Sequence, residues 1–156
     1  MGRSTIKQLL ISLMGLFIVT INIASLQDIA QNQTDKQLND KKVFHLLKKI
    51  ARDINETMPI VVESGLRCEN VNALPWRKFQ YNFTLTSLLK EEVDTTQIKN
   101  FIIKSKPVLT NAVRSDSTME LFRQQKVILI YTYRDKHANF LYNIIIKPED
   151  YQYSNH

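Results

Sequence analysis

The sequence is poor in glycine and cysteine, and each shortage excludes a class of function. Only Gly2, Gly15 and Gly65 occur among 156 residues, and the first two lie in the N-terminal segment. Loops that cradle phosphate need several glycines close together, so that backbone N–H groups can approach the anion. A P-loop or a dinucleotide-binding fingerprint is therefore excluded. The single cysteine, Cys68, excludes an intramolecular disulfide and any metal site built from several cysteines.

Clusters of metal-ligating or catalytic side chains are also missing from the sequence. The histidines, His45, His137 and His156, form no HExxH-like pair, and no aspartate–histidine group has metal-ligand spacing. Cys68 stands at an alternating strand position, which is typical of a small buried hydrophobe. We therefore predict no catalytic residue, no metal and no cofactor. A paired-carboxylate hydrolase stays formally open, because such residues meet only in the fold.

The charge of the chain is mildly basic, with a formal net charge of +6. A nucleic-acid binder usually shows a denser and more clustered excess of lysine and arginine. We therefore expect no nucleic-acid partner.

The N-terminal segment, residues 1–26, is typical of an export signal. Arg3 and Lys7 form a short positive region, and the stretch from Leu9 to Leu26 carries no charge. This order favours the Sec-type export route, which leaves the rest of the chain on the periplasmic or extracellular side of the cytoplasmic membrane. The protein is then either secreted or anchored there.

Cleavage of this segment stays open. The uncharged stretch is short for a spanning helix, and the small-residue site at Ile23-Ala24-Ser25 is imperfect. Residues 1–26 are thus a signal peptide or a membrane anchor, and residues 5–26 contact the membrane if they are retained. We expect a polar linker over 27–40 and a single domain over 41–153.

The strongest strand signal lies in Lys126–Pro148. Two runs, Lys126–Tyr133 and Phe140–Lys147, are dense in β-branched and aromatic residues and are separated by a polar break, which predicts an antiparallel hairpin. One face of this hairpin is predicted to carry Val127, Leu129, Tyr131 and Tyr133 from the first run, with Phe140, Tyr142, Ile144 and Ile146 from the second. Further strands are expected over Leu66–Ala73 and Lys78–Thr86.

Three helical regions complete the pattern. The first is expected over Gln37–Glu56, before Pro59. Its apolar face carries Val43, Leu47, Ile50 and Ile54, and its opposite face carries Lys41, His45, Lys48 and Arg52. A second helix should begin near Asp94 and be kinked or split at Pro107, and a short third helix should cover Met119–Gln125. These elements predict an α+β fold, with helices on one face of a roughly four-stranded antiparallel sheet preceded by an N-terminal hydrophobic helix.

The aromatic strand residues allow more than one interpretation. Rings on a sheet beside basic residues can stack on single-stranded nucleic acid, and a partly open sheet could take an apolar ligand. The same face must also be covered by the helices, so we expect it to form the core. The candidate contacts for a partner are instead Trp76 and Arg77, in a turn led by Pro75, and the basic residues Lys41, Lys48 and Arg52.

Four segments give the chain a resemblance to a set of small bacterial envelope proteins. They are MPIVVESGLRCENVNALP, FQYNFTL, PVLTNAV and VILIYTYRDKHANFLYNIIIKPEDY, within Leu46–Tyr151. The proteins that the chain resembles combine an export signal with a "YxYTL" strand, an "NxxC" helix, a "GVxxxYxYxDxxG" hairpin and a terminal cysteine. Here the two cysteines are replaced near Arg114 and Tyr151, and the hairpin glycines near Lys126 and by Ala138-Asn139. The resemblance implies this fold and compartment, and a disulfide that this chain has lost; it implies no activity.

Three hypotheses of function follow. The first is a non-catalytic envelope domain that binds another envelope or membrane protein, such as an accessory subunit of a membrane-bound sensor or secretion system. The second is a carrier or sensor of a small apolar ligand. The third is a small envelope enzyme that uses a sheet–helix cleft.

Overall fold

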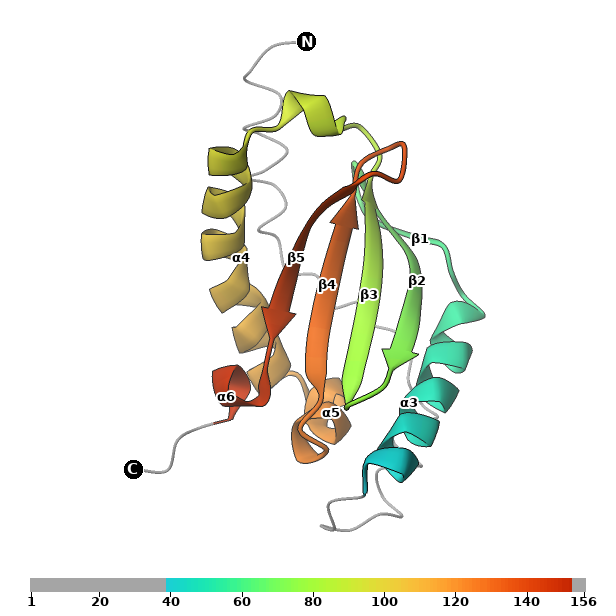
Figure 1. Ribbon diagram of the computed structural model, residues 1–156. Helices are drawn as coiled ribbons and strands as arrows, with labels where there is room; N and C mark the ends of the chain where they lie inside the picture. The colour runs from blue at the N-terminus through green and yellow to red at the C-terminus, as the bar shows by residue number, and fades with distance from the viewer. Residues whose placement is uncertain (1–38, 153–156) are drawn as a thin grey trace.

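The computed structural model describes residues 39–152, in which five strands form one mixed sheet in the order β1-β2-β3-β4-β5 (Figure 1). The strands are β1 (Ile60–Glu63), β2 (Leu66–Leu74), β3 (Lys78–Leu85), β4 (Ile128–Arg134) and β5 (Phe140–Ile146). The helices are α3 (Asp40–Asn55), α4 (Thr95–Ser115), α5 (Glu120–Gln124) and α6 (Pro148–Tyr151), with single 3-10 turns η1 (Lys90–Glu92) and η2 (Ser117–Met119). The α+β class is confirmed. The predicted N-terminal helix and export signal lie outside the described residues.

The sheet differs from the predicted one in two respects. β1 adds a fifth strand, and β3 pairs with β4 in parallel, whereas the other neighbouring strands are antiparallel. Parallel neighbours need a crossover connection, and α4 with α5 supplies it between β3 and β4. Alternation along a strand shows which residues are buried but not which strand lies beside it, so the sequence pattern did not indicate this pairing.

Asparagine side chains fix both ends of helix α3. The Asn39 carboxamide oxygen accepts from the Lys42 backbone N–H at 3.0 Å. At the other end, the Asn55 carboxamide donates to the Val71 carbonyl at 2.9 Å and accepts from the Val71 N–H at 2.8 Å. Val71 lies opposite Tyr81 of β3, but β1 pairs with β2 only as far as Cys68, so Asn55 satisfies the Val71 backbone on the edge that β1 does not reach.

Helix α4 packs along β5 at the opposite side of the sheet (Figure 1). Its first turn is closed by a reciprocal cap between Asp94 and Gln97, with N–H to side-chain oxygen distances of 2.8 and 3.0 Å. The helix continues through Pro107 as one element, so the expected split does not occur. Pro107 and Ile103 are both exposed, and solvent can therefore satisfy the carbonyl whose intrahelical partner proline removes.

The core contains a row of stacked aromatic rings that crosses the middle of the sheet. Tyr81 of β3 stacks on Tyr131 of β4 with ring centroids 5.3 Å apart, and Tyr133 stacks on Tyr142 of β5 at 4.8 Å. Each of these four tyrosines is only 5–6% exposed. The aromatic face is therefore core, as expected, and it is not an open stacking platform.

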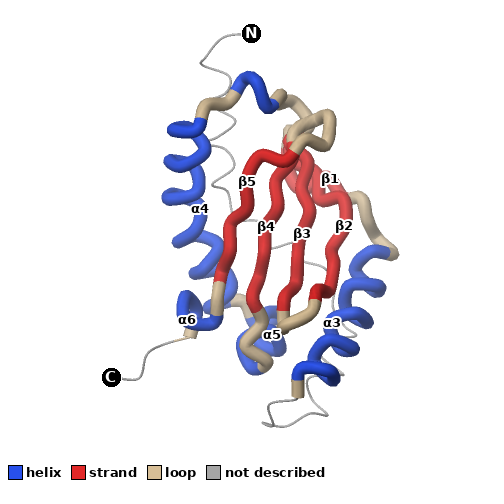
Figure 2. The backbone as a smooth tube through the Cα atoms, in the orientation of Figure 1, coloured by secondary structure: helices blue, strands red, loops and turns tan. Residues whose placement is uncertain are grey.

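One residue of the predicted aromatic face is placed wrongly. Phe140 was expected beside Tyr142, but it is 46% exposed. The strand register shifts between the Tyr133–Tyr142 pair and the Arg134–Phe140 pair, and this bulge turns Phe140 to the other face. That face is mixed: the Gln80 amide donates to the Thr132 hydroxyl at 2.7 Å, and Ile145 beside them is 42% exposed. The helices lie on one side of the sheet and leave the other side uncovered (Figure 2).

Candidate interaction surface

The β2–β3 turn has a backbone that its residues do not favour. Trp76 and Arg77 have φ angles of 63° and 55°. Two consecutive residues with positive φ occur in tight hairpin turns, where Asn-Gly is the usual pair because bulky side chains are disfavoured in the left-handed region. Trp76 is nevertheless 74% exposed, as predicted, so it gains little burial from this conformation.

Arg77 joins this turn to two other segments. Its Nε atom donates to the Asp40 carboxylate at 2.5 Å, at the start of α3. A second guanidinium nitrogen donates to the Gln125 carbonyl at 2.8 Å, and the Arg77 carbonyl accepts from the Ile128 N–H at 2.7 Å. The start of α3, the β2–β3 turn and the α5–β4 connection therefore meet at one end of the sheet.

Three lysines follow residues that Arg77 contacts at this end. Lys41 and Lys42 follow Asp40 in the first turn of α3, and Lys126 follows Gln125. All three lysines are exposed, and Asp40 is paired with Arg77. We call the surface formed by Lys41, Lys42, Trp76, Arg77 and Lys126 the Trp76 end.

The structure brings together three of the five predicted contact residues: Lys41, Trp76 and Arg77. Lys48 and Arg52 lie further along the exposed face of α3, where Lys48 Nζ is 5.7 Å from the centroid of the Phe44 ring and Arg52 pairs with Asp53 at 3.4 Å. Sequence reasoning missed Lys126. The hydrogen bond that places it beside Arg77 joins residues 48 positions apart, and no local pattern indicates such a contact.

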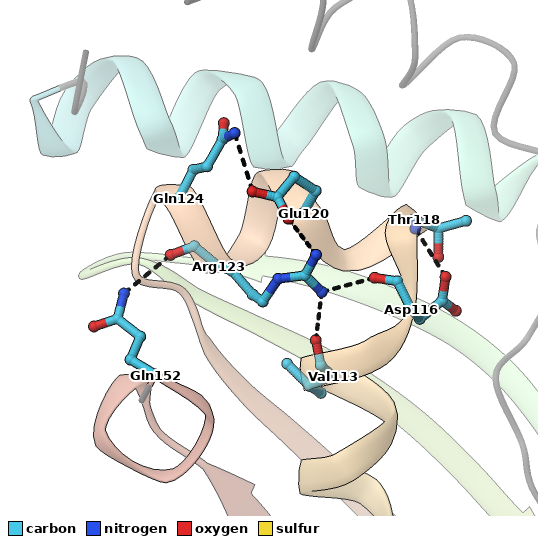
Figure 3. A network of polar contacts seen from close by, with 7 residues as sticks. All are labelled: Val113, Asp116, Thr118, Glu120, Arg123, Gln124 and Gln152. Carbon is cyan, nitrogen blue, oxygen red and sulfur yellow. Dashed lines mark hydrogen bonds and ion pairs between the residues drawn. The ribbon is translucent and has the colours of Figure 1, made fainter. Parts of the chain in front are cut away.

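A polar network holds α5, and with it the connection that reaches Arg77. The Arg123 guanidinium donates to the carbonyls of Val113 and Asp116 at 2.6 and 2.7 Å and pairs with Glu120 (Figure 3). The Gln152 amide donates to the Arg123 carbonyl at 3.3 Å. This network joins the end of α4, the 3-10 turn η2 and the C-terminal segment to α5. It therefore holds in place Gln125, whose carbonyl Arg77 contacts.

Cys68 and Asp135 could in principle take part in catalysis, but both have structural roles here. Cys68 is fully buried, and burial, assisted by the neighbouring Glu69 carboxylate, raises the pKa of its thiol to about 12. It is therefore no thiolate nucleophile at neutral pH.

Within residues 39–152, no three histidine, cysteine or acidic side chains are placed to hold a metal ion. None of the helices within the same range is long and apolar enough to cross a membrane.

Asp135 also has a structural role. Its buried carboxylate accepts from the Asn139 side chain at 3.0 Å and from the backbone N–H groups of Asn139, His137 and Lys90 at 2.8, 2.9 and 3.1 Å. Burial by itself raises the pKa of Asp135, but these hydrogen bonds to the charged form outweigh it and lower the pKa to about 2. Asp135 thus organises the β4–β5 loop and joins it to the start of η1.

Comparison with solved structures identifies the architecture. A candidate secreted protein from Pseudomonas aeruginosa superposes with a TM-score of 0.59 at 12% sequence identity, over 75% of this chain and 99% of that one. The pilotin EpsS of the Vibrio vulnificus type 2 secretion system gives a TM-score of 0.55 at 9% identity, over 74% of this chain and 96% of its own. The type II secretion pilotin AspS of Vibrio cholerae gives 0.51 at 8% identity, over 71% and 94%.

At these identities the likeness concerns the fold. The α+β domain is of the kind found in these two pilotins and the Pseudomonas protein, nearly from end to end of each. Neither a protein-family model nor a curated protein matches the sequence.

Proposed function

We propose that this protein is a non-catalytic, exported domain of the cell envelope that binds a protein subunit of a membrane-bound apparatus. One observation carries the proposal: the domain shares its architecture with pilotins of two type II secretion systems over 96% and 94% of their chains. The predicted export signal at residues 1–26 supports the same compartment. In a Gram-negative host the domain faces the periplasm.

The two alternative functions are less well supported by the geometry. An apolar-ligand carrier needs an open aromatic face, yet Tyr81, Tyr131, Tyr133 and Tyr142 are 5–6% exposed and stacked on one another. An enzyme needs titratable groups that converge on a solvent-accessible site. Cys68 is instead fully buried, and the Asp135 carboxylate accepts hydrogen bonds from its own loop and from the Lys90 N–H.

The exposed face of α3 is the proposed contact for the protein partner. Lys48 and Arg52 lie along it beyond Lys41, and both are exposed. A basic helix face favours an acidic partner surface, chiefly by steering the encounter and aligning the two surfaces. The partner contact therefore follows α3 away from the Trp76 end.

Co-purification from membranes tests the proposal. The full chain, with its native N-terminus and a C-terminal tag, is cross-linked in cells and captured, and the captured protein and the state of residues 1–26 are identified by mass spectrometry. The test variant is Lys48→Glu/Arg52→Glu, which reverses two charges on α3. The matched control is Lys99→Glu/Lys104→Glu, which reverses two exposed lysines on α4.

A specific envelope partner that the α3 variant loses and the α4 control keeps is the expected result. If the chain is instead recovered cleaved, monomeric and unpartnered, the accessory-subunit proposal should be abandoned. Equal loss in both variants would show that net charge, and not the α3 face, governs capture.

A further inference from the structure

The position of Trp76 suggests a second surface with a different kind of partner. Trp76 is the only tryptophan in the chain, it is 74% exposed, and its backbone is held in the left-handed region. Backbone strain of this kind persists when surrounding contacts hold the segment in place, and it clusters at functional sites. Here the Arg77 contacts to Asp40, Gln125 and Ile128 do so.

We propose that the Trp76 end contacts an anionic membrane surface. Tryptophan is enriched at membrane–water interfaces because its ring is apolar while its N–H can remain solvated. Lysines beside it are attracted by the negative potential of anionic lipids. Lys41, Lys42 and Lys126 are exposed at the Trp76 end, and Asp40 is paired with Arg77.

The residue types at this end favour a lipid surface over a protein. Protein interfaces are enriched in arginine and depleted in lysine. At the Trp76 end, Arg77 points inward to Asp40 and the Gln125 carbonyl, and the cations left facing outward are all lysines. Lysine carries a compact charge on a long flexible stem, which suits a fluid layer of head groups better than a fixed partner surface.

The path of the chain brings the same end toward the bilayer. Helix α3 starts at Asp40, and Asp40 is bonded to Arg77 in the Trp76 turn. Residues 27–39 join the uncharged N-terminal segment to this point, and a chain of that length spans at most about 45 Å. If residues 1–26 stay in the membrane, the chain enters the domain at the Trp76 end, within that reach of the bilayer. A short tether also gives an effective concentration on the order of millimolar, so weak contacts suffice. The inference thus rests on the anchored form of the proposed function.

The single tryptophan makes a direct test possible, because all tryptophan emission comes from residue 76. The full chain is reconstituted through its N-terminus into vesicles of phosphatidylcholine alone or with 30% phosphatidylglycerol, each with or without brominated acyl chains, which quench tryptophan at contact. Anionic vesicles should shift the emission to the blue and quench it. Neutral vesicles should do neither, and high salt should reverse the effect because it screens the lysines.

Charge variants locate the contact. Each surface lysine contributes roughly five-fold to binding of an anionic membrane, so Lys41→Gln/Lys42→Gln/Lys126→Gln should weaken the contact on the order of 100-fold. The control, Lys90→Gln/Lys99→Gln/Lys136→Gln, removes three exposed lysines from η1, the first turns of α4 and the β4–β5 loop. These lie at the opposite end of the strands, and quenching should persist in this control.

Three outcomes would overturn the membrane contact. They are emission that no lipid changes, equal quenching in neutral and anionic vesicles, and shielding of Trp76 that appears only when the captured protein partner is added. The last outcome would assign the Trp76 end to a protein. None of them depends on the α3 capture experiment, so this inference and the proposed function can fail separately.

Discussion

Replacing Tyr142 by phenylalanine should stabilise the domain. The Tyr142 side chain is 6% exposed, and within residues 39–152 its buried hydroxyl has no hydrogen-bond partner. A buried polar group left without a partner costs about 1–3 kcal/mol. Removing the oxygen also removes some packing contacts, so we expect a net gain of about 1 kcal/mol for Tyr142→Phe. The Ser105 hydroxyl on α4 is likewise buried and unpaired, and Ser105→Ala should act in the same direction.

Tyr151 provides the matched control. It is 1% exposed, and its hydroxyl donates to the Val127 carbonyl at 2.8 Å. Tyr151→Phe deletes the same atom but leaves that buried carbonyl without its donor, so it should destabilise by about 1–2 kcal/mol. Removing the hydroxyl should therefore raise the free energy of unfolding at Tyr142 and lower it at Tyr151, because only the Tyr151 hydroxyl makes a hydrogen bond.

Urea unfolding at pH 7, followed by circular dichroism, measures both effects. For a domain of this size, 1 kcal/mol corresponds to a shift of about 4 °C in thermal midpoint, which gives an independent reading. The slope of unfolding against urea should stay constant, since both variants expose the same surface. If Tyr142→Phe lowers the urea midpoint as much as Tyr151→Phe does, the Tyr142 hydroxyl makes a hydrogen bond in the folded protein. That result would refute our reasoning.

Four further substitutions test the hairpin and the residues that flank it. Lys126 and Ala138 have φ angles of 52° and 64°, so Lys126→Gly and Ala138→Gly should each stabilise by about 0.5–1 kcal/mol in urea unfolding; a lower midpoint for either would contradict this. Because the pKa of Asp135 is depressed, its stabilisation is complete above its unfolded pKa of about 4 and is lost as pH falls through about 2. Asp135→Asn should therefore flatten the acid limb of a stability–pH curve, and an unchanged limb would argue against it. Tyr131→Ser should cost a few kcal/mol through lost aromatic burial, and an unchanged thermal midpoint would show that the ring is exposed.

Local patterns were enough to predict most elements of this fold. β3 and the β4–β5 hairpin lie within two residues of their predicted bounds, because alternation and turn chemistry act over short stretches. The exposed position of Trp76 also followed from its turn. Lys126 and Ala138 both have positive φ. These are the backbone positions where glycine has no steric penalty.

What the patterns missed depends on contacts between distant parts of the chain. The bulge that exposes Phe140 and the gathering of Lys126 onto the Trp76 end both need the partner strand or the Arg77 side chain. The contact between α4 and α6 illustrates the same point. The Arg114 guanidinium donates to the Asp150 carbonyl at 2.5 Å and so joins the two helices. No spacing rule relates these residues, which are 36 positions apart.

The parallel pairing of β3 with β4 has a consequence for how the domain forms. The β2–β3 and β4–β5 hairpins each close over short loops, whereas the central bond from Gln80 to Thr132 joins residues 52 positions apart. Closing a long loop costs more chain entropy and slows folding. The domain therefore consists of two parts, α3 to β3 and α4 to α6, each built from contacts that are short in sequence. The two parts meet where β3 pairs with β4 and Tyr81 stacks on Tyr131. Two fragments, made by dividing the chain between Leu85 and Thr95, should each gain structure when they are mixed. The pairing of β3 with β4 should form last.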